Sequence, residues 1–404
     1  MKVTISPSVA KGSITAPPSK SVAHRALICG ALSKGSTIRN IVDSQDVEAT
    51  LRCLEAMGAT VQRNADHVFV GGLDPFHIPA ETILDCGESA STLRFLLPLC
   101  LLSSVPVHLT GSERLLERPL DVYERLCQDS NLTFLRTKCA ITVCGSLSAG
   151  EYCVRGDVSS QFITGLLFAL SLLDGESTII IKEPFESRSY VALTQRIQSD
   201  FGVSVRIEGN TRIGIYGNGK YRAQEYCVEG DYSNAAFLDA FNLLDGRVKV
   251  MGLSRESAQG DTVYKDFYDR FSASDRHFDL SDCPDLGPVM FALSAALGGA
   301  EFSGTARLRI KESDRVAAMV QELEKFGVFA TVAENSVKIH PAVLHTPTQV
   351  LCGHNDHRIV MALSLLCSKV GGTIEGAEAV AKSYPDYFDA IRSLGIDVAI
   401  WEVL

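Results

Sequence analysis

Residues 159–182 read SSQFITGLLFALSLLDGESTIIIK, and they show the plan on which most of the chain is built. The segment opens with small polar residues that can cap a helix, continues for about three turns that are apolar nearly all round, and breaks at a glycine before a β-rich run. Five other segments follow the same order; they cover residues 19–41, 88–111, 233–252, 284–305 and 355–376. Their starts lie roughly 70 residues apart, except for a shorter step from 233 to 284, and this periodicity indicates an internally repeated fold.

The apolar turns of these segments are hydrophobic on nearly every side, and such a helix lies inside a protein rather than on its surface. Six helices should therefore be surrounded by strands. A second series of helices is amphipathic and is followed by a glycine and a strand; its members cover residues 47–57, 193–201, 316–326 and 388–394. Each repeat is thus predicted to be an α/β unit with one inner and one outer helix, and six units divide naturally into two domains of three.

The composition is that of a globular protein too long for one core, with 404 residues of which 46% are hydrophobic. A net charge of -10 argues against a broad nucleic-acid surface, which needs an excess of Lys and Arg. The twelve cysteines are scattered singly without a CxxC pair, which predicts reduced thiols and no zinc site. The start of the chain has no apolar signal core, and the most apolar run, residues 95–109, is shorter than a membrane span. We therefore expect a cytoplasmic protein that binds neither nucleic acid nor a membrane.

Residues 17–27, PPSKSVAHRAL, place Lys20, Ser21 and Arg25 at the start of the first inner helix of an otherwise acidic chain. A helix N-terminus offers free N–H groups and a partial positive charge, so it can bind phosphate or carboxylate. Polar or basic side chains also begin the other inner helices, namely Ser89, Ser91, Thr92, Arg94, Ser159, Ser160, Gln161, Ser233, Asn234, Asp285, His357 and Arg358. The intervening loops add Arg114, Arg118, Ser187, Arg188, Tyr190, Arg307, Lys311, Glu312, Arg315 and Lys382. If the inner helices of a domain run parallel, these groups gather on one face and predict a small ligand with more than one anionic group.

Each of these features also has a simpler interpretation. Lys20 and Arg25 alone are typical of a solvated helix end, and Asp285 alone is most often a helix cap. His354 and His357 are spaced so that both could bind a metal, but the HExxH pattern is absent and an arginine would lie beside the cation. We therefore predict no metal site. The coincidence of so many such groups with six helix starts favours anion binding.

Six motifs, in this order, resemble the 5-enolpyruvylshikimate-3-phosphate (EPSP) synthase family: PPSKSVAHRAL, LTGSERLLERPL, GDVSSQF, RLRIKESDR, HNDHR and AKSYPDYF. The resemblance runs from residue 19 to residue 388. It implies a two-domain inside-out α/β barrel of six βαβαββ-type repeats, three per domain, around buried parallel helices. The expected domains are residues 1–18 together with 230–404, and residues 19–229. The active site is expected in the cleft between them.

The resemblance implies transfer of the enolpyruvyl group of phosphoenolpyruvate to the 5-hydroxyl of shikimate 3-phosphate, with release of phosphate, on the route to chorismate and the aromatic amino acids. The reaction passes through a tetrahedral intermediate and needs no metal or organic cofactor, and the family usually works as a monomer. Matching positions assign shikimate 3-phosphate to Lys20, Ser21, Arg25, Ser159, Ser160, Gln161, Ser187, Tyr190, Asp285 and Lys311. They assign phosphoenolpyruvate to Lys20, Ala90, Arg118, Gln161, Arg315, Arg358 and Lys382. The catalytic candidates are Asp285, Glu312, Lys20 and His357. Glu312 is expected to protonate the methylene carbon, and Asp285 or Lys20 to relay the hydroxyl proton.

Three positions depart from the family pattern. The second inner helix begins Gly87-Glu88-Ser89-Ala90-Ser91, where the family commonly reads G-N-[SA]-G-T. The methyl group of Ala90 should project into the phosphoenolpyruvate pocket and hinder the longer inhibitor glyphosate more than the substrate, so we expect reduced glyphosate sensitivity. Glu88 replaces an asparagine and should face away from the anionic ligand. Arg307 stands where some members have asparagine, so the resemblance does not define its contact.

Two related enzymes and one non-enzyme are the alternatives. UDP-N-acetylglucosamine enolpyruvyl transferases have asparagine after the lysine and a cysteine on a mobile loop, whereas here Ser21 follows Lys20 and no cysteine lies between residues 101 and 126. RNA 3′-phosphate cyclases share the fold, but the acidic charge of this chain argues against RNA. A non-catalytic protein that binds a phosphorylated metabolite would gain nothing from Asp285 and Glu312, because added carboxylates oppose anion binding.

Overall fold

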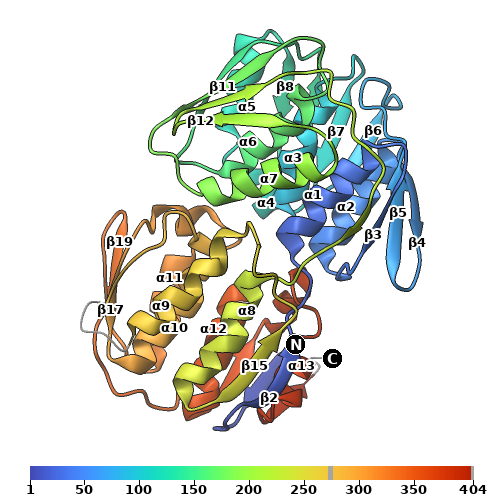
Figure 1. The fold of residues 1–404 in the computed structure, drawn as a ribbon. Coiled ribbons are helices and arrows are strands. Elements are labelled where there is room, and N and C mark those ends of the chain that lie inside the picture. The colour runs from blue at the N-terminus through green and yellow to red at the C-terminus, as the bar shows by residue number, and fades with distance from the viewer. Residues whose placement is uncertain (272–275, 402–404) are drawn as a thin grey trace. The chain divides into compact units, whose positions relative to one another are not determined.

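The computed structural model describes residues 1–271 and 276–401, and in it the chain forms two compact α/β units (Figure 1). One unit is continuous and comprises Pro18–Glu229. The other is discontinuous and comprises Met1–Pro17 with Gly230–Leu404. Each unit is built from three repeats, as the sequence predicts.

The continuous unit holds three four-stranded sheets. Its strands are β3 (Ser36–Arg39), β4 (Thr60–Arg63), β5 (His67–Gly71), β6 (Thr82–Asp85), β7 (Val107–Thr110), β8 (Thr133–Arg136), β9 (Ala140–Cys144), β10 (Glu151–Arg155), β11 (Ser177–Lys182), β12 (Val205–Glu208), β13 (Arg212–Ile215) and β14 (Glu225–Cys227). Its helices are α1 (Lys20–Ala31), α2 (Gln45–Ala56), α3 (Ala90–Cys100), α4 (Glu113–Glu117), α5 (Asp121–Asp129), α6 (Ser160–Leu170) and α7 (Arg188–Asp200). The sheet orders are β14-β3-β5-β4, β6-β7-β9-β8 and β10-β11-β13-β12, and in each the first pair is parallel and the other pairs are antiparallel.

The discontinuous unit follows the same plan with one strand from the N-terminus in each of two sheets. Its strands are β1 (Lys2–Ile5), β2 (Lys11–Thr15), β15 (Arg247–Met251), β16 (His277–Asp279), β17 (Ala300–Ser303), β18 (Ala330–Val332), β19 (Ser336–Ile339), β20 (Leu351–Cys352), β21 (Gly372–Glu375) and β22 (Val398–Trp401). Its α-helices are α8 (Tyr232–Asp239), α9 (Tyr264–Arg270), α10 (Gly287–Leu297), α11 (Arg315–Lys325), α12 (His357–Val370) and α13 (Tyr387–Ser393). Short 3₁₀ helices are η1 (Ala240–Leu244), η2 (Gly260–Val263), η3 (Pro284–Leu286), η4 (Ala306–Ile310) and η5 (Ala377–Lys382). The sheet orders are β15-β2, β16-β17-β19-β18 and β20-β21-β1-β22.

The predicted inner helices are confirmed as α1, α3, α6, α8, α10 and α12. In α6 every residue from Phe162 to Leu170 is buried, because the helix presents apolar side chains in all directions. The helix joins β10 to β11, which are parallel neighbours, so it must pass across one face of their sheet. Within each unit the inner helices pack on one another, α3 against α6 and α10 against α12 (Figure 1).

The short sequence step from 233 to 284 corresponds to a shortened fourth repeat. This repeat contributes β2, α8, β15 and α9, and its sheet has two strands. Only six residues, 271–276, separate α9 from β16 of the next repeat. Among the described residues, the third and fourth strands of the other repeats have no counterpart in this two-stranded sheet.

The outer helices α2, α7, α11 and α13 match the four predicted amphipathic segments. A left-handed glycine follows each of them, namely Gly58, Gly202, Gly327 and Gly395, with φ of 104°, 84°, 83° and 90°. Two outer helices, α5 and α9, were not predicted individually. In α5 the left-handed position after the helix is Asn131, with φ of 53°, so the glycine signal is absent.

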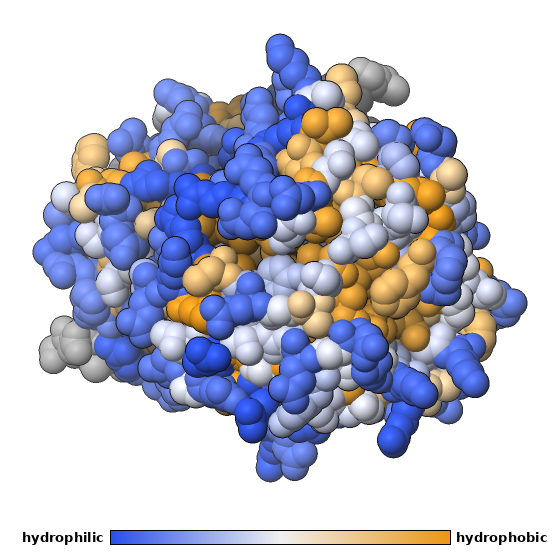
Figure 2. Space-filling view, turned by 90° about the horizontal axis from the view of Figure 1, so that it is seen from above, coloured by the Kyte–Doolittle hydropathy of each residue, from blue (hydrophilic) through white to orange (hydrophobic). Residues whose placement is uncertain are grey.

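On the face shown in Figure 2, hydrophobic side chains (orange) lie among hydrophilic ones (blue). The well-exposed hydrophobic residues of the protein include Ile83 and Leu135, each 61% exposed, on the two edge strands of one sheet. Apolar residues on the outer face of a sheet are ordinary in soluble folds and need no partner to explain them. No helix among the described residues is long and apolar enough to cross a membrane.

A proline, a tyrosine and a glycine allow the close approach of α3 and α6. Pro98 lies inside α3 and has no N–H to donate to the carbonyl of Arg94, and the hydroxyl of Tyr123 on α5 donates to that carbonyl instead, at 2.6 Å. Burial raises the pKa of the Tyr123 phenol, so the hydroxyl keeps its proton. Gly165 of α6 packs at the same point: a Cβ there would come closer than 3.0 Å to the Arg94 carbonyl oxygen and the Tyr123 hydroxyl.

We expect Gly165→Ala to lower the free energy of unfolding by about 1–3 kcal/mol, because the added methyl overpacks the contact between α3 and α6. This loss opposes the gain of about 1 kcal/mol that alanine normally brings inside a helix. Urea unfolding followed by circular dichroism measures it. Gly150→Ala is the matched control, since Gly150 is exposed and a Cβ there meets nothing within 4 Å. Equal stability of the two variants would show that the contact tolerates a methyl group.

Candidate active site

Most of the predicted residues of the continuous unit lie where α1, α3, α6 and α7 begin, and we call this group the Lys20 cluster. Two predicted arginines lie outside it: Arg188 donates to Asn210 and to the Gly209 carbonyl, and Arg114 is exposed on α4. Ser19 caps α1 by accepting from the Val22 N–H, and Lys20 is the first helical residue. The Lys20 ammonium donates to the Asp46 carboxylate at 2.7 Å, and the two side chains are 13% and 11% exposed. Asp46 lies in the first turn of α2, where a negative charge also complements the helix dipole.

Arg25 is buried one turn further along α1. Its guanidinium donates to the Thr194 hydroxyl at 2.8 Å, the Ser21 carbonyl at 2.7 Å and the Tyr190 carbonyl at 3.2 Å, and it lies 5.0 Å from the centre of the Phe95 ring. Burial lowers the pKa of the Arg25 guanidinium to about 10, so it remains charged at neutral pH. Arg25 therefore ties the start of α1 to the start of α7, and it fixes the backbone of two predicted ligand-binding residues.

Gln161 connects the starts of α3 and α6. Its side-chain carbonyl accepts from the Arg94 guanidinium at 2.8 Å, and its amide donates to the Ser91 hydroxyl at 3.0 Å. Arg94 also donates to the Pro119 carbonyl at 2.9 Å, directly beside Arg118, which is buried at the end of α4. Gln161 at the start of α6 thus contacts Ser91 and Arg94, two predicted residues of α3.

Other predicted residues lie at the same helix starts. Ser159 caps α6 by accepting from the Gln161 N–H, and Ser160 is buried in the first turn. Ala90 is the buried first residue of α3. These residues place hydroxyl groups and a methyl group beside the free N–H groups of two helices.

Ser187 has a strained backbone. It stands immediately before α7 with φ of 51° and ψ of 40°, and it is 1% exposed. The left-handed conformation costs residues other than glycine about 1–2 kcal/mol. Such outliers gather at ligand sites, where the surrounding structure holds them. The strain is an independent reason to regard Ser187 as a functional residue.

The predicted residues of the discontinuous unit form a second group, the Arg315 cluster. At its centre is Asp285, which accepts from Lys311 at 3.2 Å, from Arg315 at 2.9 Å and from Arg358 at 3.0 Å. Although burial alone would raise it, the pKa of Asp285 is held well below its usual range by the charges of Arg358, Lys311 and Arg315. Asp285 is therefore an ionised carboxylate and does not serve as a helix cap.

The side chain of Lys311 is 20% exposed, and its surroundings favour loss of its proton. Burial lowers the pKa of the Lys311 ammonium to about 8, and the neighbouring charges of Arg315 and Arg307 act in the same direction, while Asp285 opposes them. Arg307 thus lies close enough to Lys311 to influence it electrostatically.

Arg315 binds three carboxylates at once and is only 1% exposed. Its guanidinium donates to Asp285, to Glu312 and to Asp356, each at 2.9 Å. Burial alone would lower the pKa of Arg315, but Asp356, Glu312 and Asp285 raise it above its usual range. The cluster therefore places Glu312 and Asp285 on one guanidinium.

Asp356 organises the start of α12. It caps the helix by accepting from the Arg358 N–H at 2.9 Å, and its other contacts are with Arg315 and with Ser313 at 3.0 Å. The Arg358 guanidinium also donates to the Ser233 hydroxyl on α8. His357 is the buried first residue of α12. The starts of α8, α10 and α12 are thus connected.

Lys382 reaches the same turn from the end of η5. It is 4% exposed, and its ammonium donates to the Asn355 carbonyl at 2.6 Å. Every predicted residue of this unit except Glu312, Lys311 and Asp285, which are partly exposed, is therefore buried.

Asp46 and Asp356 are the two residues that the sequence analysis did not single out. Both are carboxylates that hold a predicted cation, Lys20 or Arg315. Asp46 resembles an ordinary acidic residue in the first turn of an outer helix, so no local signal marks it. Asp356 lies inside the HNDHR motif, next to the histidine and arginine that were selected.

His354 and His357, the two candidate metal ligands of the sequence, make different contacts. The His354 ring donates to the Glu322 carboxylate at 3.0 Å, whereas His357 begins α12. Residues 1–271 and 276–401 contain no group of three or more His, Cys, Asp or Glu side chains arranged to bind a metal ion.

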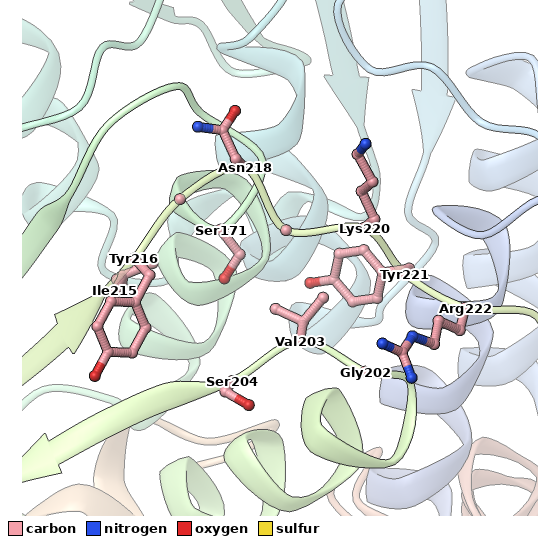
Figure 3. Close-up of a pocket in the computed structure, with 12 residues that line it drawn as sticks. Ser171, Gly202, Val203, Ser204, Ile215, Tyr216, Asn218, Lys220, Tyr221 and Arg222 are labelled. Atoms are coloured by element: carbon pink, nitrogen blue, oxygen red, sulfur yellow. The ribbon is translucent and has the colours of Figure 1, made fainter.

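A groove of about 440 Å³ also occurs in the continuous unit, near the end of β13 (Figure 3). Its lining includes none of the predicted site residues. In Figure 3 the ammonium group of Lys220 and the guanidinium group of Arg222 lie on opposite sides of the Tyr221 ring. The two cations do not converge on one point in this view.

Both α/β units thus carry cations and hydroxyl groups at the starts of buried helices. A family model described as EPSP synthase (3-phosphoshikimate 1-carboxyvinyltransferase) matches residues 6–391. A relative named 3-phosphoshikimate 1-carboxyvinyltransferase from Clostridium kluyveri is 39% identical over 428 aligned positions, which cover 99% of each chain. A relative of the same name from Clostridium botulinum (strain Alaska E43 / Type E3) is 35% identical and covers 99% of this chain and 98% of its own length.

A solved structure of EPSP synthase from Acinetobacter baumannii matches with a TM-score of 0.79 at 22% identity, over 99% of this chain and 100% of that chain. At that identity the likeness concerns the fold. The chain belongs to the EPSP synthase family. It is accordingly an enzyme of the shikimate pathway, in the class that transfers a carboxyvinyl group.

We expect Arg315→Met to lower the free energy of unfolding by about 3–5 kcal/mol at pH 7, because three carboxylates lose their shared cation. Protonation relieves their repulsion, so the difference from wild type should shrink toward pH 4. Urea unfolding at both pH values measures it. Arg309→Met is the control; Arg309 is a third exposed and pairs with Asp314 at 3.5 Å, so its loss should cost less than about 1 kcal/mol. A loss that stays constant with pH would contradict the electrostatic explanation.

Proposed function

We propose that the protein transfers the enolpyruvyl group of phosphoenolpyruvate to the 5-hydroxyl of shikimate 3-phosphate and releases phosphate. The observation that carries the proposal is the position of Asp285 and Glu312 on the one guanidinium of Arg315, each at 2.9 Å, with Lys311 and Arg358 also on Asp285. Acid–base chemistry on an anionic substrate needs carboxylates and cations at one place. Membership of the family agrees with this assignment.

The cations of the Arg315 cluster have protein partners that substrate anions can replace or join. Arg358 and Lys311 contact Asp285, and Lys382 contacts a backbone carbonyl. Buried guanidinium and ammonium groups bind phosphate and carboxylate by charge-assisted hydrogen bonds. In the proposal, Arg315, Arg358 and Lys382 bind phosphoenolpyruvate with Lys20, Ala90, Arg118 and Gln161, as the resemblance assigns them.

In the proposal, residues of the Lys20 cluster bind shikimate 3-phosphate together with Asp285 and Lys311 of the other unit. Helix starts with serines, as at Ser159 and Ser160, suit a phosphate group. The strained Ser187 and the nearby Tyr190 add hydroxyl groups. We expect both substrates to be small molecules and the enzyme to act as a monomer in the cytoplasm. The prediction that the reaction takes place in the cleft between the domains stays a prediction.

The proposed steps balance as an addition followed by an elimination. The 5-hydroxyl oxygen of shikimate 3-phosphate bonds to C2 of phosphoenolpyruvate, its proton leaves, and the methylene carbon gains a proton to become a methyl group. The tetrahedral intermediate then loses phosphate from C2 and a proton from the methyl group, which restores the double bond. Asp285, which is ionised, accepts the hydroxyl proton directly or with Lys20, and Glu312 carries the proton of the methyl group. His357 assists at the reacting centre.

The alternative transferase, which acts on a UDP-amino sugar, would release phosphate with that sugar in place of shikimate 3-phosphate. The alternative of a non-catalytic binding protein would bind without release. Neither is favoured by a specific contact among the described residues, and the family match covers nearly the whole chain.

Phosphate release from phosphoenolpyruvate tests the proposal. We expect release only when shikimate 3-phosphate is also present, in buffer freed of metal ions. Glu312→Gln should reduce kcat by at least about a hundredfold, the usual scale for loss of an acid–base group, and should still bind both substrates. Glu334→Gln, at an exposed position, should match wild type. Release with the UDP-amino sugar, or substrate binding without release, would replace the proposal with one of the alternatives.

We expect the Ala90→Gly variant to be more sensitive to glyphosate than the wild type, because removal of the methyl group at the first residue of α3 opens space beside the proposed phosphoenolpyruvate site. The KM for phosphoenolpyruvate should change less than the inhibition constant. Inhibition constants from phosphate release at several inhibitor concentrations measure the difference. Ala169→Gly, in a buried turn far along α6, controls for a general loss of stability. Equal inhibition of Ala90→Gly and wild type would rule out this role of the methyl group.

A further inference from the structure

The turn that leads into α12 has an unusual backbone. His354 and Asn355 are both left-handed, with φ of 49° and 51°, although neither is glycine. The turn presents the Asn355 carbonyl to Lys382 at 2.6 Å, and Asp356 follows it at the start of α12. Two consecutive strained residues persist only when their surroundings fix them.

Glu322 of α11 is the group that fixes this turn from the other side. Its carboxylate accepts from the Cys352 N–H at 2.9 Å and lies 3.0 Å from the Nε2 atom of His354. The Lys325 ammonium donates to both carboxylate oxygens, at 3.0 and 2.8 Å, and to the Val350 carbonyl at 3.1 Å. The Glu322 side chain is 0% exposed.

The contacts of Glu322 favour its ionised form. Burial would raise the pKa of this carboxyl, but the hydrogen bonds from His354, Lys325 and the Cys352 N–H hold it below its usual value. A buried carboxylate with several donors gives one well-defined geometry, because each lost contact leaves a charged group without compensation.

Two residues of α11 contact opposite ends of this turn. Arg315 and Glu322 lie seven residues apart on α11, which is about two turns of α-helix, so they project from the same face. Arg315 binds Asp356 at the end of the turn, and Glu322 binds Cys352 and His354 before it. The position of Asn355 is therefore set by α11.

We propose that Glu322 is a positioning residue for phosphoenolpyruvate: through Cys352 and His354 it holds the turn that orients Lys382 and Arg358. The inference rests on the proposed function, because it takes these two cations as ligands of phosphoenolpyruvate. Glu322 touches no substrate in this proposal. Its effect should be confined to the substrate that Lys382 and Arg358 bind.

The first test compares Glu322→Gln with Glu324→Gln, an exposed glutamate on the same helix. Glutamine keeps the shape of Glu322 but removes the negative charge that Lys325 and His354 contact. We expect the KM for phosphoenolpyruvate to rise about tenfold or more, as for loss of charge-assisted hydrogen bonds, with little change in the KM for shikimate 3-phosphate. Glu324→Gln should match wild type. Equal changes in both KM values, or a lower melting temperature with unchanged KM values, would overturn the proposal.

Two variants of His354 test whether Glu322 positions the turn or only stabilises the fold. His354→Ala keeps the Glu322–Lys325 pair but removes the contact with the turn, so the KM for phosphoenolpyruvate should rise. His354→Gln can place an amide nitrogen near Glu322 and should recover much of the affinity. The two variants have the same left-handed backbone requirement, so strain does not distinguish them. An equal KM for His354→Ala, His354→Gln and wild type would overturn the inference.

A measurement independent of turnover completes the design. Amide hydrogen exchange in residues 352–358 should be faster in Glu322→Gln than in Glu324→Gln. Equal exchange would show that Glu322 does not hold the turn. If the wild type released no phosphate with shikimate 3-phosphate, the proposed function would fail and the substrate assignment would be withdrawn. Faster exchange in Glu322→Gln would in that case still show that Glu322 holds the turn.

Discussion

The constraint on which the rest of the structure depends is the burial of helices that are apolar on all sides. A helix such as α6 cannot leave one face in water, so it needs a sheet on one side and other inner helices on the rest. Three repeats around three inner helices meet that need within each unit. The inner helices α3, α6, α10 and α12 each follow the first strand of their own repeat, whereas α1 and α8 each begin where the chain enters a new unit. Polar groups nevertheless recur at all six helix starts, and the two clusters are built from them.

The electrostatics of the two clusters follow from that burial. Arg25 and Arg315 are buried cations, and a buried cation without a partner is costly. The structure meets this cost differently in the two units. Arg25 uses hydroxyl and carbonyl oxygens, whereas Arg315 uses three carboxylates. The first arrangement leaves a net positive charge at the helix starts, and the second supplies groups that can exchange protons.

The sequence predicted the inner helices and four outer helices because their signals are local. Continuous apolar turns mark the first, and a glycine after an amphipathic segment marks the second. The helix α5 lacked that mark because Asn131 takes the left-handed position. Long-range pairing was beyond local patterns: nothing near β1 indicates that it lies between β21 and β22, more than 360 residues away. The Lys20–Asp46 contact likewise depends on how α1 packs against α2.

Asp285 and Glu312 both contact the Arg315 guanidinium, yet the proposed reaction gives them different roles. Asp285 contacts three cations, and their charges keep it ionised across the neutral range. An ionised group can accept a proton but has none to give, so in the proposed reaction the proton of the methyl group must come from another residue. In the proposal that residue is Glu312, which accepts from another nitrogen of the same guanidinium. The three cations that contact Asp285 oppose its uptake of a proton, so in the proposal Glu312 takes up a proton before it acts as the acid.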